Sequence, residues 1–583
     1  VIDDSCQVLV VDNGSTDGTV DYLRGLDWIR LIRNDKNLGF VRGNNIGIRL
    51  IETDRDVVLL NNDMLITQRD WLPRLQAAAY SADDVGIAGC RLLNARGDLL
   101  HAGTVMPTDS FRGFQLGSNE KDVNQYNRLR EVEGVVGACM YIRRAVLDAI
   151  GPLNEQYFSY YEDTDYCLTA RRAGFRTVCA GDVTLMHVEN VSTRVNKTDF
   201  SSMYDQSRDV FIKRWKDELT GARSAERVGV VWHSLVSFPT GYATSSKQLV
   251  LSLDRLGVDV RLAYVFGTDY MEPPDEDPRI NALKRKPKDL ALPQVLYSQG
   301  DNFVKNSGRY KIGFTMLEVD GLPRDWVDQA NGMDEVWVPS TFNVETFRNS
   351  GVRKPVYVVP LGVNPDYFNP GIRSYKPTSR YTFLSVFEWG ERKAPEVLLK
   401  AYTDEFDESD DVLLILKISN QDASVDVAQQ IAAMGLRRTA APICLLYNQR
   451  LPGHQFGALY RSADCFVLPS RGEGWCMPAM EAMACGLPTI VTDWSAQHDF
   501  INPEIAYPLR VARLIPAVAK CPYYEGFRWA DPDIEHLRTL MRYVYEHPAE
   551  AAEVGARASR EVLSRWTWDQ AAARILERLK AVT

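Results

Sequence analysis

The sequence lacks several features that mark well-known classes of protein. It has no apolar run of about 18 residues, no signal peptide, no tandem repeat and no low-complexity segment. Its ten cysteines include no C-x-x-C pair, which argues against a zinc site or a disulfide framework and favours reduced, mostly buried thiols. We therefore expect a cytoplasmic protein whose only membrane contact, if any, is peripheral, at the inner face of the plasma membrane.

An excess of basic residues is also missing. The net charge is −10 at pH 7, whereas nucleic-acid binders usually carry a basic surface, so we expect no nucleic-acid partner. A local basic patch that faces a phosphate or an anionic membrane stays open. With 583 residues, of which 45% are hydrophobic and 25% charged, the chain has the composition of a globular protein and the length of about three domains.

Short apolar runs alternate with helical stretches along the chain, which predicts an α/β fold. In the first part, residues 8–11 and 56–60 are expected to be buried parallel strands, with helices at 19–26 and 70–80. The chain starts at Val1 and is almost at once inside a strand, so we expect this domain to be incomplete at its N-terminus.

A second part begins after the polar stretch 217–226, which we expect to be a linker. A βαβ unit is predicted over residues 228–262, followed by an irregular, Pro- and charge-rich segment at 271–290. Another α/β block starts near residue 381, and the tail 533–582 has the apolar stripe of helices. Later strands of this block are expected at 412–416, 443–446, 465–468 and 489–491.

Polar residues follow the predicted strands of the first part. Asp12 comes after residues 8–11, and Asn61 and Asp63 come after residues 56–60. Ligands of open α/β sheets bind at the carboxyl ends of strands, where Asp12 is placed to contact a nucleobase or ribose and Asp63 to hold Mg²⁺ or Mn²⁺ against a diphosphate. Taken alone, each is explained about as well as a turn or helix-capping residue.

Three carboxylates, Glu162, Asp163 and Asp165, lie in the aromatic-rich segment 157–167. Burial beside aromatic rings raises the pKa of a carboxyl group, which suits a general base that deprotonates an acceptor hydroxyl. The alternative is a helix start with acids at the positive end of the helix dipole. The aromatic surroundings favour the functional interpretation.

Together, these segments resemble a family 2 glycosyltransferase of the GT-A fold over nearly all of residues 1–216. The resemblance implies inverting transfer by single displacement, with Asp12 on the base or ribose, Asp63 on the metal-bound diphosphate and Asp163 as the base. His187 would complete the shell of Mg²⁺ or Mn²⁺. Two departures are the missing opening strand and a single carboxylate in the Asn-Asn-Asp motif. The matching segments are residues 11–19, 37–40, 60–63, 137–139 and 161–165.

A Gly-flanked loop, residues 470–476, leads from the strand expected at 465–468 into a helix with Pro478 near its first turn. Such a loop presents backbone N–H groups and a positive helix dipole to a diphosphate. Glu481 lies inside the helix among Ala and Met, and a buried acid needs a partner, which sugar or ribose hydroxyls would supply. The alternative is a helix-capping Glu473 with Glu481 on the surface.

Arg392 and Lys393 follow the strand expected at 382–387. Cations at this place neutralise charge on a leaving diphosphate without any metal. In isolation, a solvated charge cluster is the default interpretation of these two residues.

Residues 227–583 resemble a family 4 glycosyltransferase with two Rossmann-like halves, the GT-B fold. The strongest marks are Glu473 and Glu481 in an E-x7-E pattern and residues 482–488; supporting segments are residues 336–340, 359–363 and 392–393. The resemblance implies retaining, metal-independent transfer, with residues 227–371 as the acceptor domain and 372–583 as the donor-nucleotide domain.

The same resemblance implies roles for individual residues. Lys393, helped by Arg392, binds the diphosphate; Glu473 holds the donor sugar and Glu481 the ribose. Further donor- or substrate-binding candidates are Gly474 and Trp475 of the loop, Gly241 of a Gly-rich loop at the interdomain cleft, and Glu318 and Asp320, which stand where the family often has a His.

The sequence therefore predicts a GT-A-type mixed-sheet domain, a short linker and a GT-B module of two Rossmann-like domains. We expect a bifunctional glycosyltransferase of the hexosyltransferase type that uses nucleotide-sugar donors and a glycan or lipid-linked glycan acceptor. The expected product is a growing cell-surface glycan of the O-antigen, capsule or exopolysaccharide type. The alternative is that only the second module is active and the first domain binds a glycan or a partner.

Overall fold

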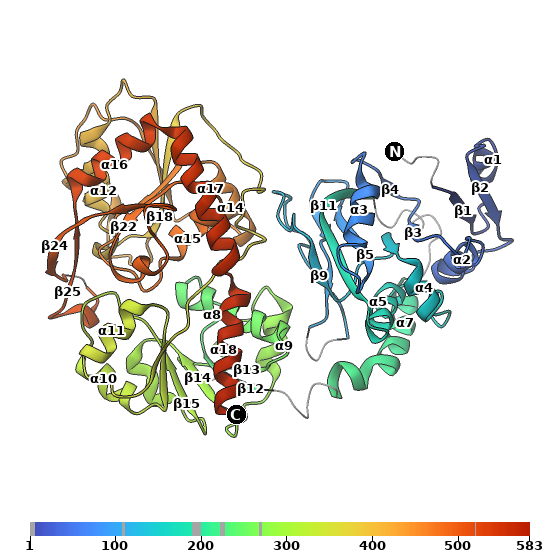
Figure 1. Cartoon of the computed structure of the whole chain (residues 1–583), viewed down its shortest axis with the longest axis horizontal. Coiled ribbons are helices and arrows are strands. Elements are labelled where there is room, and N and C mark those ends of the chain that lie inside the picture. Colours follow the sequence, from blue (N-terminus) through green and yellow to red (C-terminus); the bar gives the residue numbers. More distant parts are fainter. Residues whose placement is uncertain (1–5, 108–110, 189–199, 222–227, 268–270, 519) are drawn as a thin grey trace. The chain divides into compact units, whose positions relative to one another are not determined.

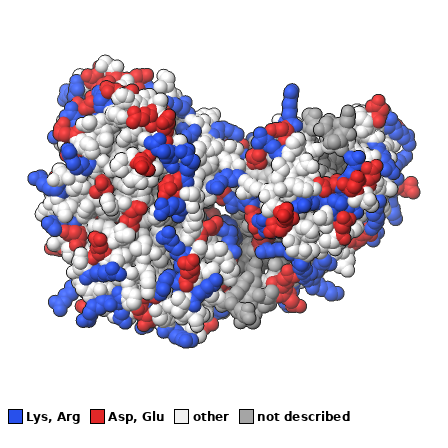
Figure 2. Space-filling view, in the orientation of Figure 1, with Lys and Arg blue, Asp and Glu red and all other residues white. Residues whose placement is uncertain are grey.

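The computed structural model describes residues 6–107, 111–188, 200–221, 228–267, 271–518 and 520–583. The chain divides into two compact units, Val1–Ala225 and Glu226–Thr583 (Figure 1). On the face shown in Figure 2, Lys and Arg side chains are interspersed with Asp and Glu side chains on each unit. Within the described ranges, every helix is too short or too polar to cross a lipid bilayer.

The first unit is built on a mixed sheet in the order β3-β10-β5-β11-β4, in which β11 is parallel to β5 and the other neighbours are antiparallel. Its strands are β3 (Val57–Leu60), β10 (Cys139–Ile142), β5 (Val85–Leu93), β11 (Arg176–His187) and β4 (Met64–Leu65), with β6 (Leu99–His101) on β5 and β9 (Arg130–Val132) on β11. Separate pairs are formed by β1 (Val8–Asp12) with β2 (Ile29–Arg33) and by β7 (Thr104–Val105) with β8 (Phe114–Gln115).

Some helices of the unit pack against this sheet, and others against the pair of β1 and β2. They are α1 (Thr19–Arg24), α2 (Gly39–Ile48), α3 (Trp71–Ala79), α4 (Arg144–Ile150), α5 (Glu162–Arg172) and α7 (Phe200–Lys216). Trp71 and Leu75 of α3 pack against Leu92 and Leu185 of β5 and β11.

Two expectations for the first unit were wrong in part. The strand expected at 56–60 is β3, Val57–Leu60, but it runs antiparallel to β10. A continuous apolar run indicates burial without giving strand direction, and the partner strand lies about 80 residues further on. Strand β1 is parallel to β2 as expected, yet only its last residue, Asp12, is buried.

The second unit contains two parallel six-stranded sheets, in the orders β13-β12-β14-β15-β16-β17 and β20-β19-β18-β21-β22-β23. The first sheet comprises β12 (Gly229–Ser234), β13 (Asp259–Tyr264), β14 (Gln294–Tyr297), β15 (Lys311–Phe314), β16 (Glu335–Val338) and β17 (Val356–Val358). The second comprises β18 (Tyr381–Glu388), β19 (Val412–Ser419), β20 (Ile443–Tyr447), β21 (Cys465–Leu468), β22 (Thr489–Thr492) and β23 (Tyr507–Leu509). The α/β fold class is thereby confirmed, with a mixed sheet followed by two parallel ones.

Helices cover both sheets, and the last one crosses back to the first half, where α18 packs against α8 (Figure 1). In the first half they are α8 (Gly241–Arg255), α9 (Pro278–Arg285), α10 (Arg324–Asn331) and α11 (Thr341–Asn349). In the second they are α12 (Pro395–Glu405), α13 (Val427–Ala433), α14 (Gly453–Arg461), α15 (Met477–Ala484), α16 (Ile534–Glu546), α17 (Pro548–Arg565) and α18 (Trp568–Val582). An antiparallel hairpin of β24 (Val511–Pro516) and β25 (Arg528–Pro532) precedes α16.

Two polar segments are more ordered than their composition suggested. Residues 217–226 were expected to be a linker, but Asp217–Gly221 form a π-helical turn that continues α7; residues 222–226 lie outside the described part. The segment at 271–290 contains α9, whose N-terminus is capped by the Asp277 side chain. Several of its charged side chains form ion pairs, which the composition alone did not reveal.

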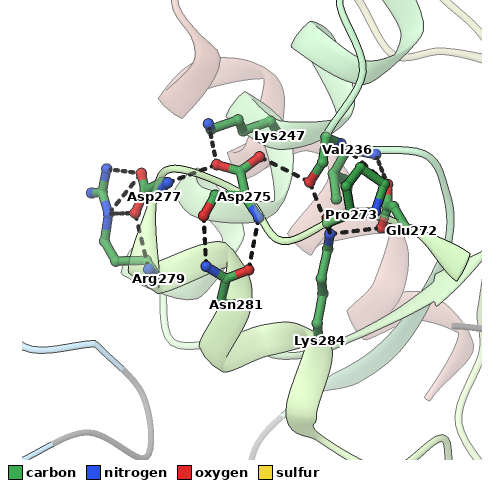
Figure 3. Close-up of polar contacts among 10 residues, drawn as sticks. Val236, Lys247, Glu272, Pro273, Asp275, Asp277, Arg279, Asn281 and Lys284 are labelled. Atoms are coloured by element: carbon green, nitrogen blue, oxygen red, sulfur yellow. Dashed lines mark hydrogen bonds and ion pairs between the residues drawn. The ribbon is translucent and has the colours of Figure 1, made fainter. Parts of the chain in front are cut away.

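Glu272 and Asp275 are two acids of that network (Figure 3). Glu272 Oε1 accepts the backbone N–H groups of Val236 at 2.6 Å and Ser237 at 3.1 Å, and Glu272 Oε2 lies 3.0 Å from the Lys284 ammonium. Asp275 accepts the Ser237 hydroxyl at 3.0 Å and the Lys247 ammonium at 2.5 Å. The acidic segment therefore fixes the loop between β12 and α8, which leads directly into Gly241.

We predict that Glu272→Ala weakens this loop, because two backbone N–H groups and an ammonium lose their acceptor. A loss of about 2–4 kcal/mol in local opening free energy is expected for such a site. Hydrogen–deuterium exchange of peptides covering residues 235–240 measures it. Glu276→Ala is the matched control, because Glu276 is exposed in the same segment and its removal should leave the exchange unchanged. Equal exchange in the two variants would contradict the assignment.

Candidate active sites

In the first unit, Asp163 lies at the start of α5 with one carboxylate oxygen toward Gly137 and the other toward Thr164. Its Oδ2 accepts the Gly137 N–H at 3.2 Å, and its Oδ1 accepts the Thr164 N–H at 2.6 Å. A Cβ on Gly137 would lie 3.1 Å from the Phe40 ring, so three of the matching segments meet here. Burial raises the pKa of Asp163, while the hydrogen bonds from Thr164 and Gly137 oppose that rise.

Glu162 and Asp165 flank Asp163 but have different surroundings. Asp165 is buried and accepts Trp215 Nε1 at 2.7 Å and the Tyr157 hydroxyl at 3.1 Å, so it anchors α7 to α5. Glu162 is 6% exposed, and its Oε2 has no hydrogen-bond partner within the described ranges. Burial, followed by the neighbouring charge of Asp163, raises the pKa of Glu162 to about 8. Glu162 is therefore protonated at neutral pH.

Asp63 and His187 are brought together by the pairing of β4 with β11. His187 Nε2 lies 3.0 Å from Asp63 Oδ1, and each side chain is 16% exposed. The hydrogen bond from His187 lowers the pKa of Asp63. Asn61, two residues before Asp63, donates its backbone N–H to Ala138 O at 2.9 Å. Among the described residues, no three or more His, Cys, Asp or Glu side chains form a cluster that could hold a metal ion.

Asp12 lies at the carboxyl end of β1, where its carboxylate accepts the Ser15 N–H and stands 4.0 Å from Arg33 Nε. The adjacent Asn13 connects this strand to α2, because its Nδ2 donates to Gly39 O at 3.0 Å. The first residues of α2 then meet Gly137 through Phe40. The candidates predicted for the first site thus belong to one connected region of the unit.

In the second unit, Glu473 is buried between the two predicted cations. Lys393 Nζ lies 2.6 Å from Glu473 Oε1, and Arg392 Nη1 lies 2.9 Å from Oε2. Burial by itself would raise the pKa of Glu473, but the charges of Lys393 and Arg392 outweigh it and lower the pKa. The carboxylate therefore stays ionised and neutralises the two cations.

The loop that carries Glu473 passes close to the other half of the unit. A Cβ on Gly472 would come within 2.2 Å of Glu318 O, and one on Gly474 within 2.4 Å of Met316 Sδ, so neither position has space for a side chain. The Glu473 N–H donates to Ser495 Oγ at 2.9 Å. These contacts fix the loop at the junction of the two halves.

Trp475 was expected to contact the donor, but its side chain lies in the protein core. Its ring is 2% exposed and packs against Phe500 and Trp566, each with a centroid distance of 5.4 Å. An indole is large and apolar, and here it completes the core behind the loop. The ring therefore supports the loop from within the core.

Glu481 lies on α15 and accepts the Tyr460 hydroxyl at 2.9 Å. Burial raises the pKa of Glu481 to about 7, against the opposing effect of that hydrogen bond. The sequence showed that an acid in this helix needs a partner, but it did not reveal Tyr460, which lies on α14. Gly241 stands at the start of α8, where a Cβ would lie 3.5 Å from Met477 Cε.

Glu318 and Asp320 come from the first half of the second unit, and the structure separates them. Glu318 Oε1 lies 3.9 Å from Arg392 Nη2. Glu318 therefore belongs to an ionic cluster with Arg392, Lys393 and Glu473. Asp320 is paired with Arg528, which approaches it through the backbone N–H at 2.7 Å and Nε at 2.9 Å. Asp320 therefore has a structural partner in β25, outside the cluster around Glu473.

Comparison with known protein families agrees with the division of the chain into two units. A model described as "Glycosyltransferase like family 2" matches residues 4–206. "Glycosyl transferases group 1" matches residues 373–506, and "Glycosyl transferase-like" matches residues 444–577. The chain therefore carries glycosyltransferase domains of two kinds. It joins a family 2-like, GT-A-type domain to a GT-B-type one, as the sequence predicted.

Curated relatives match this glycosyltransferase over parts of its length. An uncharacterised protein of Sinorhizobium fredii is 28% identical over 36% of this chain and 24% of its own length. The low-salt glycan biosynthesis hexosyltransferase of Haloferax volcanii is 31% identical over 34% of this chain and 62% of its own. An O-antigen biosynthesis protein of Myxococcus xanthus is 30% identical over 24% of this chain and 11% of its own. The chain thus spans less than two thirds of each of these relatives.

Solved structures similar to the glycosyltransferase include two with distant sequences. The sucrose-phosphate synthase of Thermosynechococcus elongatus covers 61% of this chain and 100% of its own, at 16% identity and a TM-score of 0.46. The protein HepE of Anabaena, in complex with UDP-glucose, covers 60% and 99%, at 12% identity and a TM-score of 0.45.

The raised pKa of Glu162 predicts that the stability of the first unit depends on pH. Because the folded pKa of about 8 exceeds the unfolded value, the folded state holds an extra proton between about pH 4.5 and 8. The free energy of unfolding therefore falls as the pH rises through that window. Above about pH 8 it has fallen by its full amount. Glu162→Gln removes the titration, so its stability advantage over the wild type should grow to a few kcal/mol by pH 9.

Thermal unfolding of the wild type and Glu162→Gln at pH 5, 7 and 9 measures this difference. The control is Glu155→Gln, because Glu155 is an exposed acid of the same unit whose pKa is lowered by Arg49. A difference between Glu162→Gln and the wild type that does not change with pH would refute the buried, protonated carboxyl.

Proposed function

We propose that this glycosyltransferase has two active sites, one in each unit, that transfer sugars in succession from nucleotide-sugar donors to a growing cell-surface glycan. The observation that supports this most is the buried cluster of Glu473 with Arg392 and Lys393, because two cations beside a Gly-flanked loop form a site for a diphosphate. The first unit independently brings Asp163 close to the segments that hold Asp12 and Asp63.

In the proposed first reaction, Asp163 takes the proton of an acceptor hydroxyl. The acceptor oxygen forms a bond to the anomeric carbon from the face opposite the leaving group, and the bond to the diphosphate oxygen breaks, with inversion. The hydrogen bonds from Gly137 and Thr164 orient the Asp163 carboxylate. Glu162 remains protonated, so that only one of the two neighbouring acids carries charge.

Asp63 and His187 fit a divalent ion of the kind that family 2 domains use. One carboxylate and one imidazole leave most coordination positions to water and to substrate phosphates, as Mg²⁺ prefers. In this proposal these two residues hold Mg²⁺ or Mn²⁺, which when bound supplies positive charge to the diphosphate. Asp12, at the neighbouring strand end, contacts the base or ribose.

In the proposed second reaction, Arg392 and Lys393 bind the donor diphosphate without a metal. Glu473 then exchanges its contact with the cations for hydroxyls of the donor sugar, and Glu481 binds the ribose. The bond from the anomeric carbon to the diphosphate oxygen breaks, the acceptor oxygen bonds on the same face, and its proton passes to the leaving diphosphate. Residues 227–371 present the acceptor, and residues 372–583 the donor.

The names of the relatives support the choice of glycan. They describe glycan biosynthesis and O-antigen biosynthesis, and a further relative, 23% identical over 240 residues, is the N-acetylglucosaminyl-diphospho-decaprenol L-rhamnosyltransferase of Mycobacterium tuberculosis. We accordingly propose hexosyl transfer to a glycan or lipid-linked glycan. Joining the two sites in one chain raises the effective concentration of the first product at the second site.

One observation favours a narrower function in which only the second unit is catalytic. Within the described part of the chain, β1 and β2 pair only with each other and form a sheet separate from the central one. Asp12 therefore lies on a small separate pair of strands. In that case the first unit binds a glycan or a partner protein.

Separate inactivation of the two sites tests the proposal. Nucleoside diphosphate release is measured from UDP-glucose, UDP-N-acetylglucosamine, GDP-mannose and dTDP-rhamnose, with Mg²⁺, with Mn²⁺ or with EDTA. Asp163→Asn should abolish the metal-dependent release, by about 100-fold or more, because a general base contributes on that order. Glu473→Ala should abolish the EDTA-resistant release and leave the other.

Loss of one and the same activity in both variants would contradict two separate sites. Asp165→Asn is unsuitable as a control because Asp165 anchors α7; Asp148→Asn, on the exposed end of α4, is the matched substitution and should change neither activity. If the first unit binds glycan but none of the four donors, the narrower function holds.

A further inference from the structure

The hairpin of β24 and β25 connects the two halves of the second unit (Figure 1). At its tip, two adjacent tyrosines donate their hydroxyls to carboxylates of the first half. Tyr524 donates to Glu318 Oε2 at 2.7 Å, and Tyr523 donates to Asp301 Oδ2 at 2.7 Å. The two hydrogen bonds have the same length and chemistry, but only one of these carboxylates belongs to the ionic cluster.

Packing holds the hairpin against residues 317–321. A Cβ on Gly321 would come within 2.4 Å of the Phe527 ring, so the ring lies directly on the backbone. Next to it, Asp320 N–H donates to Arg528 O at 3.1 Å, which adds a backbone contact to the ion pair of these two residues. Trp529 is 2% exposed in the core shared by the hairpin and the first half.

The opposite side of β25 contacts the loop that carries Glu473. Ala530 N–H donates to Arg471 O at 2.9 Å, and Arg471 N–H donates to Arg392 O at 2.7 Å. The hairpin therefore touches both the segment with Glu318 and the segment with Glu473. It fixes the distance between one carboxylate from each half of the unit.

Arg392 lies between these two carboxylates. Its Nη1 is 2.9 Å from Glu473 Oε2, and its Nη2 is 3.9 Å from Glu318 Oε1. The other oxygen of Glu318 accepts the Tyr524 hydroxyl, so the carboxylate cannot rotate away from Arg392 without losing that bond. Burial, and then the charge of Glu318, raises the pKa of Tyr524, which keeps its hydroxyl protonated as a donor.

We propose that Tyr524 is a positioning residue of the second active site, whose hydroxyl orients Glu318 toward Arg392 for sugar transfer. The inference rests on the proposed function of that site. Glu318 touches the cluster that receives the donor, whereas Tyr524 acts only through Glu318. The aromatic ring of Tyr524 has a separate, structural role, because it packs against Trp529 at a centroid distance of 5.8 Å.

Tyr524→Phe removes the hydroxyl and keeps the ring, and Tyr523→Phe is the matched control from the same turn. Release of nucleoside diphosphate is measured in EDTA for the donor, among the four named above, that the wild type uses fastest. Tyr524→Phe should lower kcat about tenfold, as expected for a lost hydrogen bond to a charged group. The donor KM should change less than about threefold, because the nucleotide contacts lie in the other half.

Tyr523→Phe should change kcat less than about twofold, and the melting temperatures of both variants should agree with each other. A double mutant with Glu318→Gln separates positioning from general destabilisation. Tyr524→Phe should have no further effect on kcat in that background, because the carboxylate it orients is already lost. A multiplied effect in the double mutant would overturn the proposal.

Equal kcat values for the wild type and Tyr524→Phe would overturn the positioning role alone and leave the proposed function standing. A wild-type protein that releases nucleoside diphosphate from none of the donors in EDTA would overturn the proposed function, and the positioning role with it. The two failures are therefore distinguishable in one set of assays.

Discussion

The second unit depends on one buried ionic cluster, in which Glu473 lies between Arg392 and Lys393. A buried carboxylate is tolerated only where it is paired and hydrogen-bonded. Both conditions are met here, because each carboxylate oxygen has its own cation and the backbone N–H of Glu473 has Ser495. The cluster sets the path of the Gly-flanked loop, and the close approach at Gly472 brings that loop against the first half.

In the first unit, two neighbouring acids have different electrostatic environments. Glu162 and Asp163 are adjacent in sequence, yet Asp163 has two backbone N–H donors and Glu162 has an oxygen without a partner in the described part of the unit. Hydrogen bonds to the charged form favour ionisation, while burial without them favours the neutral acid. In our proposal, this difference in environment lets Asp163 act as the base while Glu162 stays neutral, a division of roles that is common in active sites.

Local patterns in the sequence predicted much of this structure. The strand Cys465–Leu468, the loop after it and α15 with Pro478 in its first turn were all predicted, because they are encoded within one short segment. Strand direction was not, since β3 is set by its pairing with β10 far along the chain. The partners of the site acids were missed for the same reason: Tyr460 and Tyr524 are ordinary tyrosines in sequence and acquire a role only through the fold.

The central claim is that the cations now paired with Glu473 are the ones that receive the donor diphosphate. Calorimetric titration, into the wild type and Glu473→Gln in EDTA, of the nucleoside diphosphate that the wild type releases fastest tests it most directly. Because Gln removes the competing carboxylate and keeps the shape, this diphosphate should bind the variant more tightly, about tenfold or more, while turnover of the sugar donor is lost. Weaker binding of it to the variant would contradict the account.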